Sequence, residues 1–146
     1  MNFIHKKSNI EGNVVLGDNV SVWPFASIRG DEKQIIIGDN TNVQDNVTIH
    51  GNTIIGNNVT IGHGAVVHGA KIGNNVLIGM HATILNGAEI EDWCIIAAGS
   101  LVLQNAKIKT GSVVKGLPGK VARKLKKKDK NLIISSYKNY LDRIKK

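Results

Sequence analysis

The sequence has little of what many folds are built around: one cysteine, two prolines, and two each of phenylalanine, tyrosine and tryptophan in 146 residues. A single cysteine excludes a disulfide framework and a cysteine-rich metal site, so a bound metal would need histidine or carboxylate ligands. The longest apolar run, from Trp93 to Ala98, has six residues, and the N-terminus lacks the apolar stretch of a signal peptide. We therefore expect a cytoplasmic protein without a membrane-spanning segment.

The positive charge is confined to the C-terminal end. The net charge is +8, yet residues 1–114 hold seven Lys and Arg against nine Asp and Glu, whereas residues 115–146 hold twelve against two. Aromatic residues that could stack on bases are not interleaved with these lysines. We expect neither a nucleic-acid partner nor a membrane partner, and we interpret the lysines as a solvated helix face.

Glycine is frequent, with 16 residues, and it often follows an aliphatic residue in a repeat of six. A helix would show a period near 3.6 and a simple strand a period of two, so a period of six indicates a hexapeptide β-helix. Eighteen repeats, three to a coil, predict an all-β fold of about six triangular coils stacked by parallel pairing. The aliphatic positions are Ile10, Leu16, Val22, Ile28, Ile37, Val43, Ile49, Ile55, Ile61, Val67, Ile72, Ile78, Ile84, Ile90, Ile96, Val102, Ile108 and Val114.

The period breaks twice and then stops. Nine residues separate Ile28 from Ile37, which predicts an extruded loop at residues 31–34, and five separate Val67 from Ile72. Beyond residue 119, apolar residues near helical spacing predict an amphipathic C-terminal α-helix. We therefore divide the chain into a β-helix over residues 1–116 and a C-terminal turn and amphipathic helix over residues 117–146, packed on the β-helix or on a neighbour.

Two histidines fall in one column of the repeat. Counting by coils places Arg29, His50, His68 and Leu85 in successive rungs of the same face. Neighbouring rungs are about 4.8 Å apart, and two imidazole nitrogens about 3.4 Å apart can share a tetrahedral metal ion. The column therefore predicts that His50 and His68 are a pair of metal ligands.

His63 falls in a different column, one coil above Asp45, and one corner of the same coil separates it from His68. It cannot join the same metal ion within one chain. A three-fold oligomer would bring His63 of one subunit against His50 and His68 of the next, with a fourth position left for water. The alternative is that these histidines simply face solvent.

The motifs Arg29-Gly30-Asp31 and Asn42-Val43-Gln44-Asp45, together with His50 and the segment from Gly62 to Gly69, closely resemble the gamma-class carbonic anhydrase family. The resemblance extends over nearly the whole chain. It implies a left-handed β-helix and a homotrimer with Zn²⁺, or Fe²⁺ or Co²⁺, at each of three subunit interfaces. It also implies the reversible hydration of CO2 to bicarbonate.

The resemblance implies a role for each of these side chains. His50 and His68 of one subunit and His63 of its neighbour would bind the metal, and Gln44 would form a hydrogen bond with the metal-bound hydroxide. Tyr140, which follows an asparagine as in related closing helices, would reach the edge of the site.

By the same resemblance, Arg29, Asp31 and Asp45 would form the ion pairs of the trimer interface, although exposed pairs of little energetic value are the alternative. Glu32 aligns with one proton-shuttle glutamate of the family's most studied type. That type also carries an acidic loop soon after the first histidine, where residues 51–54 here continue the repeat. The resemblance therefore implies a carbonic anhydrase of low activity.

Two other classes of protein share these features. A hexapeptide-repeat acyltransferase has the same fold and oligomer, but it needs a catalytic histidine beside an acyl-CoA or acyl-carrier cleft. A metal-binding scaffold of the same family would keep the fold and the metal with little turnover.

Overall fold

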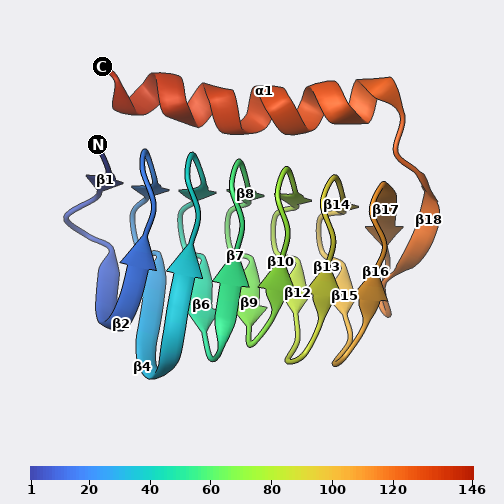
Figure 1. Ribbon diagram of the computed structural model, residues 1–146, viewed down its shortest axis with the longest axis horizontal. Coiled ribbons are helices and arrows are strands. Elements are labelled where there is room, and N and C mark those ends of the chain that lie inside the picture. The colour runs from blue at the N-terminus through green and yellow to red at the C-terminus, as the bar shows by residue number, and fades with distance from the viewer.

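The computed structural model describes residues 1–146, and short parallel strands recur along the chain from Phe3 to Lys115 (Figure 1). Seven short strands stack along one side of the molecule and form its first face, with an eighth strand added antiparallel at the end. In spatial order these strands are β1 (Phe3–Ile4), β3 (Ser21–Val22), β5 (Asn42–Val43), β8 (Thr60–Ile61), β11 (Leu77–Ile78), β14 (Ile95–Ile96), β17 (Ser112–Lys115) and β18 (Lys120–Lys124).

The other sheet bends around a corner and forms two further faces. Strands β2 (Asn9–Leu16) and β4 (Ser27–Ile37) cross the corner and belong to both faces. The second face continues with β6 (Thr48–His50), β9 (Val66–His68), β12 (Thr83–Ile84) and β15 (Leu101–Val102). The third face continues with β7 (Thr53–Ile55), β10 (Lys71–Ile72), β13 (Glu89–Ile90) and β16 (Lys107–Ile108).

The three faces make a left-handed parallel β-helix of about six coils. Strands of the first face pair with the strand one coil later, so that Asn42 lies opposite Thr60 and Thr60 opposite Leu77. The aliphatic residues of the repeat point inward and form one core, with only Ile10 and Leu16 partly buried at its open first coil. The fold class predicted from the period of six is confirmed.

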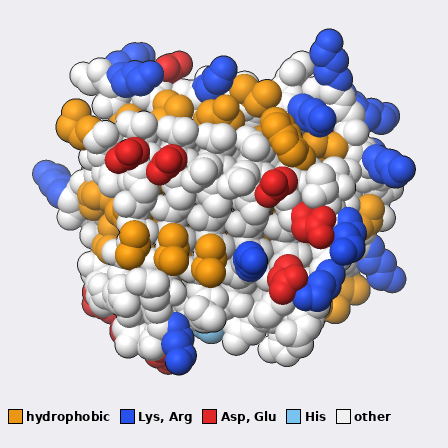
Figure 2. Space-filling model, viewed as in Figure 1, with side chains coloured by type: hydrophobic (Ala, Val, Ile, Leu, Met, Phe, Trp, Pro, Cys, Tyr) orange, Lys and Arg blue, Asp and Glu red, His pale blue; other side chains and the backbone are white.

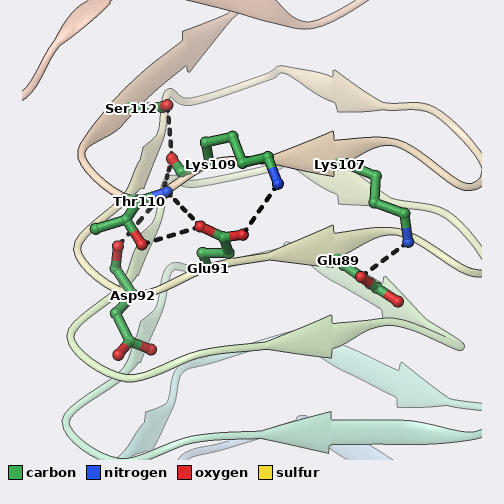
Figure 3. Close-up of polar contacts among 8 residues, drawn as sticks. Glu89, Glu91, Asp92, Lys107, Lys109, Thr110 and Ser112 are labelled. Atoms are coloured by element: carbon green, nitrogen blue, oxygen red, sulfur yellow. Dashed lines mark hydrogen bonds and ion pairs between the residues drawn. The ribbon is translucent and has the colours of Figure 1, made fainter.

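Each coil turns at corners that need left-handed backbone. Asn58 has a φ of 57°, and its side-chain amide donates to Asn75 of the next coil at 3.1 Å. Charged pairs link coils across the third face in the same way (Figure 3). Lys107 lies 2.8 Å from Glu89, and Glu91 accepts hydrogen bonds from the backbone and side chain of Thr110. These contacts fix neighbouring coils in register.

The third face also carries an apolar ladder. Its register places Val15, Ile36 and Ile54 side by side, followed by Lys71 and then Glu89. Figure 2 shows this row of apolar side chains giving way to charged ones toward the C-terminal coils. The row is part of the solvent-facing surface of this chain.

The prediction of an extruded loop at residues 31–34 is wrong. These residues belong to β4 and lie where the register between β2 and β4 shifts, opposite Asn13. All four are exposed. They bulge from a continuous strand because β2 pairs with β4 on both sides of them.

The C-terminal segment first adds β18 to the sheet and then forms α1 (Lys127–Ile144), which lies along the first face (Figure 1). Strand β18 was not predicted. At the start of α1, Ile133 is buried against Ile95 and Val113, and near its end the ring of Tyr140 packs edge-on against Trp23. No helix in the structure has the length and apolarity needed to cross a membrane.

Candidate metal centre

His50 and His68 lie side by side at the end of the second face. They are the last residues of β6 and β9, which pair with His50 opposite His68. Nδ1 of His50 is 3.1 Å from Nε2 of His68, and the ring planes cross at 70°. The register predicted for this pair is confirmed.

The outer nitrogen of each ring faces an oxygen. Nε2 of His50 is 2.9 Å from Oδ1 of Asp31, and Nδ1 of His68 is 2.5 Å from Oδ1 of Asn86. Carboxylate and amide oxygens only accept hydrogen bonds, so both outer nitrogens carry the proton. In neutral rings, the inner nitrogens then face each other with two lone pairs across 3.1 Å. This arrangement is repulsive unless a metal ion, or a proton added to one ring, lies between the two nitrogens.

Arg29 precedes His50 in the column and supports Asp31. Its Nη1 is 3.5 Å from Oδ2 of Asp31, and its Nη2 is 3.4 Å from Nε2 of His50. Partial loss of hydration beside His50 raises the pKa of the exposed Asp31 carboxyl, but the hydrogen bond from His50 and the charge of Arg29 outweigh it and keep this pKa below its usual value. Asp31 is therefore ionised at neutral pH. It accepts a hydrogen bond from Nε2 of His50, because it lies closer to this nitrogen than Arg29 does.

The opposite end of the second face holds a second set of residues, which we call the His63 corner: His63, Asp45 and Gln44. Nδ1 of His63 is 3.3 Å from Oδ1 of Asp45, and 45% of the His63 side chain is exposed. Gln44 is buried, and its amide donates to Oδ1 of Asn42 at 3.1 Å. The amide of Asn42 in turn donates to the Thr60 hydroxyl at 2.9 Å. This chain of amides leaves the Gln44 oxygen free to accept a hydrogen bond.

Tyr140 reaches the His63 corner from α1. It lines a cavity together with Gln44 and His63, and its place at the edge of a metal site stays a prediction. Burial raises the pKa of the Tyr140 hydroxyl, and the nearby Asp45 raises it further against the opposing charge of Arg143. The phenol therefore stays protonated at neutral pH and can donate a hydrogen bond.

The candidate residues thus form two groups within one chain. Arg29, Asp31, His50 and His68 gather at one end of the second face, and Asp45, Gln44, His63 and Tyr140 at the other. No three histidine, cysteine or carboxylate side chains of the chain come close enough to hold a metal ion. Glu32 lies exposed in the bulge of β4 and makes no ion pair.

Asn86 is the residue that the sequence analysis missed. It follows the column of Arg29, His50 and His68, but it lies one residue beyond Leu85, which occupies the next rung. A polar residue next to the predicted rung was the available signal. Only the side-chain geometry identifies Asn86 as the acceptor that fixes the tautomer of His68.

Comparison with known proteins agrees with this architecture. A family model described as bacterial transferase hexapeptide (six repeats) matches residues 34–69 and 69–104. A segment of 49 residues is 47% identical to a carbonic anhydrase of Methanosarcina thermophila, covering 33% of this chain and 20% of that protein. The chain spans 9% to 30% of the lengths of the curated relatives it matches first.

Two solved structures match over almost the full chain. A putative acetyltransferase of Bacillus cereus is 36% identical with a TM-score of 0.77, and the match covers 97% of this chain and 88% of that one. A hexapeptide transferase family protein of Anaplasma phagocytophilum is 32% identical with a TM-score of 0.88, and the match covers 97% of this chain and 89% of that one. With its repeats, its coils and these full-length relatives, the chain belongs to the hexapeptide transferase family.

Proposed function

We propose that this protein is a metal-dependent, gamma-type carbonic anhydrase that reversibly hydrates CO2 to bicarbonate. His50 and His68 of one subunit and His63 of the next would bind Zn²⁺, or Fe²⁺ or Co²⁺, in a homotrimer. The match to the Methanosarcina carbonic anhydrase supports the reaction class. The separation of the histidines into two groups within one chain supports a site shared between subunits.

The observation that carries the proposal is the pair of bare nitrogens between His50 and His68. Asp31 and Asn86 take the outer protons, so both inner lone pairs point into the same gap. Their separation of 3.1 Å is close to the roughly 3.4 Å that two nitrogens need on a tetrahedral Zn²⁺ ion. A nitrogen pair held in this way suits a divalent cation and is repulsive when both rings are neutral and nothing lies between them.

Each of the remaining residues has a specific task. When bound, the metal would acidify water so that a nucleophile is available near neutral pH. The free oxygen of Gln44 would accept a hydrogen bond and orient the attacking or leaving oxygen. Glu32, exposed to solvent on its bulge, would take up the released proton and pass it to buffer. Arg29, Asp31 and Asp45 would hold the two groups against each other across the interface.

The test is metal analysis of anaerobically purified protein, followed by stopped-flow CO2 hydration. We expect about one metal ion per chain and a measurable hydration rate. His50→Ala should lose both, whereas His5→Ala, a histidine outside both groups, should keep them. Metal without turnover would contradict the enzyme and leave a metal-binding scaffold; absence of metal from freshly purified and metal-supplemented protein would contradict the whole proposal.

A second candidate is acyl transfer, which the full-length match to the putative acetyltransferase favours. The assay is release of free thiol from acetyl-CoA in the presence of amine acceptors. The protein contributes little background, because its one cysteine, Cys94, is buried and burial raises the pKa of its thiol. Acceptor-dependent thiol release that survives His50→Ala and metal removal would favour the acyltransferase over the carbonic anhydrase.

A further inference from the structure

One edge of the packed side of α1 becomes polar in the second half of the helix. In its first half, Ile133 is buried against Ile95 and Val113 and seals the helix onto the first face. In its second half, the residues at the same helical spacing are Ser136, Asn139, Tyr140 and Arg143, and all four line a cavity. The apolar stripe of α1 continues beside them with Tyr137, Leu141 and Ile144, which are partly buried, so the cavity lies along one edge of the packed stripe.

The cavity lies between this half of α1 and the His63 corner, and its volume is about 370 Å³. Its apolar wall comes from Leu77, Met80 and Ala98. Gly62 and Gly79, which follow the paired strands β8 and β11, also line it and contribute no side chain to fill the space. The volume falls within the range of about 300–1,000 Å³ that is usual for small-molecule sites, far more than a one-carbon molecule can fill.

Polar groups without partners converge on this cavity. Neither Asn139 nor Arg143 makes a side-chain hydrogen bond or ion pair within the chain, and the hydroxyl of Tyr140 makes none. The guanidinium of Arg143 contacts only the face of the Tyr140 ring, 5.6 Å from its centre. The lining contains no carboxylate, and Arg143 is its one Lys or Arg side chain.

We propose that this cavity binds a small aliphatic carboxylate of several carbons. Its anionic end would pair with Arg143 and accept hydrogen bonds from Tyr140 and Asn139, and its carbon chain would cover Leu77 and Met80. One guanidinium matches one carboxylate in charge and can form two parallel hydrogen bonds with it. The apolar wall favours binding of a carbon chain. Because His63 and Gln44 line the same cavity, the acid would bind beside the proposed metal site, but its binding does not depend on the proposed function.

The experiment measures binding of formate, acetate, butyrate and hexanoate by NMR titration of the isotope-labelled protein, as purified and again after chelation of metals. We expect saturable binding whose affinity rises with each methylene by up to about fourfold. Hexanamide, which has the same chain without the charge, should bind about tenfold more weakly than hexanoate. The amides of α1 around Tyr140 and those around Met80 should report the binding.

Arg143→Gln should weaken hexanoate binding about tenfold and leave hexanamide unchanged. Lys138→Gln removes a cation from the same helix outside the cavity and should change neither. Equal binding of acid and amide, or hexanoate binding that survives Arg143→Gln, would overturn the proposal. Binding lost on chelation would overturn it too, because the acid would then be a metal ligand. A protein that binds hexanoate but no metal would refute the proposed function alone.

Discussion

The two ends of the second face hold their histidines in different ways. His50 and His68 come from paired strands of consecutive coils, and each has an oxygen acceptor that fixes its ring. His63 has one contact, to Asp45 at 3.3 Å, and nearly half of its side chain is exposed beside a cavity. The stacking of the coils therefore builds the first group within one chain, whereas the second group is open toward α1 and toward whatever lies against it.

Subunit mixing tests this difference most strongly. His63→Ala chains keep the histidine pair, and chains with both His50→Ala and His68→Ala keep the His63 corner. Each variant alone should bind no stoichiometric metal, because the first keeps two and the second only one of the three histidine ligands. Refolding the two together at equal amounts should restore about a quarter of the sites, since only interfaces of one orientation are complete. Metal content of the repurified mixture is the measurement.

The outcome that contradicts a shared site is equally clear. If His63→Ala alone kept one metal ion per chain, or if the mixture recovered none while both variants formed trimers, the two ends of the face would not belong to one centre. Light scattering of each sample checks the oligomer.

Removal of the proposed proton exporter, Glu32, should have a large effect on kcat only. Glu32→Ala should lower kcat for CO2 hydration within the range of about 10²–10⁴-fold and leave kcat/KM nearly unchanged, because export follows the chemical step. Imidazole buffer should restore kcat by carrying the proton itself. Lys33→Ala, in the same exposed bulge, is the control. An equal fall in both constants would mean that Glu32 supports the site and does not export protons.

The hydrogen bond that orients the ring of His68 can be removed without substituting a metal ligand. Asn86→Ala removes the acceptor of the Nδ1 proton, and we expect metal affinity to fall about 10–100-fold, as is usual when such an outer partner is lost. Asn52→Ala, an exposed asparagine that follows His50 at the same corner, should leave it unchanged. NMR of the ring nitrogens of His68 in metal-free protein should show the tautomers mixing. Unchanged affinity and tautomer in Asn86→Ala would refute this role.

The repeat made the coils predictable and left other contacts unpredicted. Inward aliphatic residues every six positions depend only on neighbouring repeats, so the fold, the register of His50 and His68, and a C-terminal helix could be read from the sequence. The role of Asn86 could not be read from the sequence, because five residues instead of six separate Val67 from Ile72. This shorter coil places Leu85, and not Asn86, in the column of His50 and His68. The corner strand β4, strand β18 and the cavity under α1 depend on contacts between segments without the repeat.

The smallest expected effect concerns the anchor of α1, which forms one wall of the His63 corner. Asp129 is buried at the start of the helix, where Arg123 donates to both of its carboxylate oxygens at 2.6 and 3.0 Å and the backbone of Lys126 donates at 2.7 Å. These hydrogen bonds hold the pKa of Asp129 far below its usual value of 3.8. The ionised carboxylate therefore stabilises the fold above that value, and this stabilisation is lost as the pH falls toward the lower folded pKa.

Asp129→Asn should consequently lower the Tm by a few degrees at pH 7, and the difference from the unaltered protein should shrink below about pH 4. Asp142→Asn, on the same helix without an ion pair, should show no such dependence. Because α1 borders only the His63 corner, the variant should weaken hexanoate binding in the cavity while the ring nitrogens of His50 and His68 keep their tautomers. A Tm difference that persists unchanged to pH 3 would mean that Asp129 acts through packing and not through its charge.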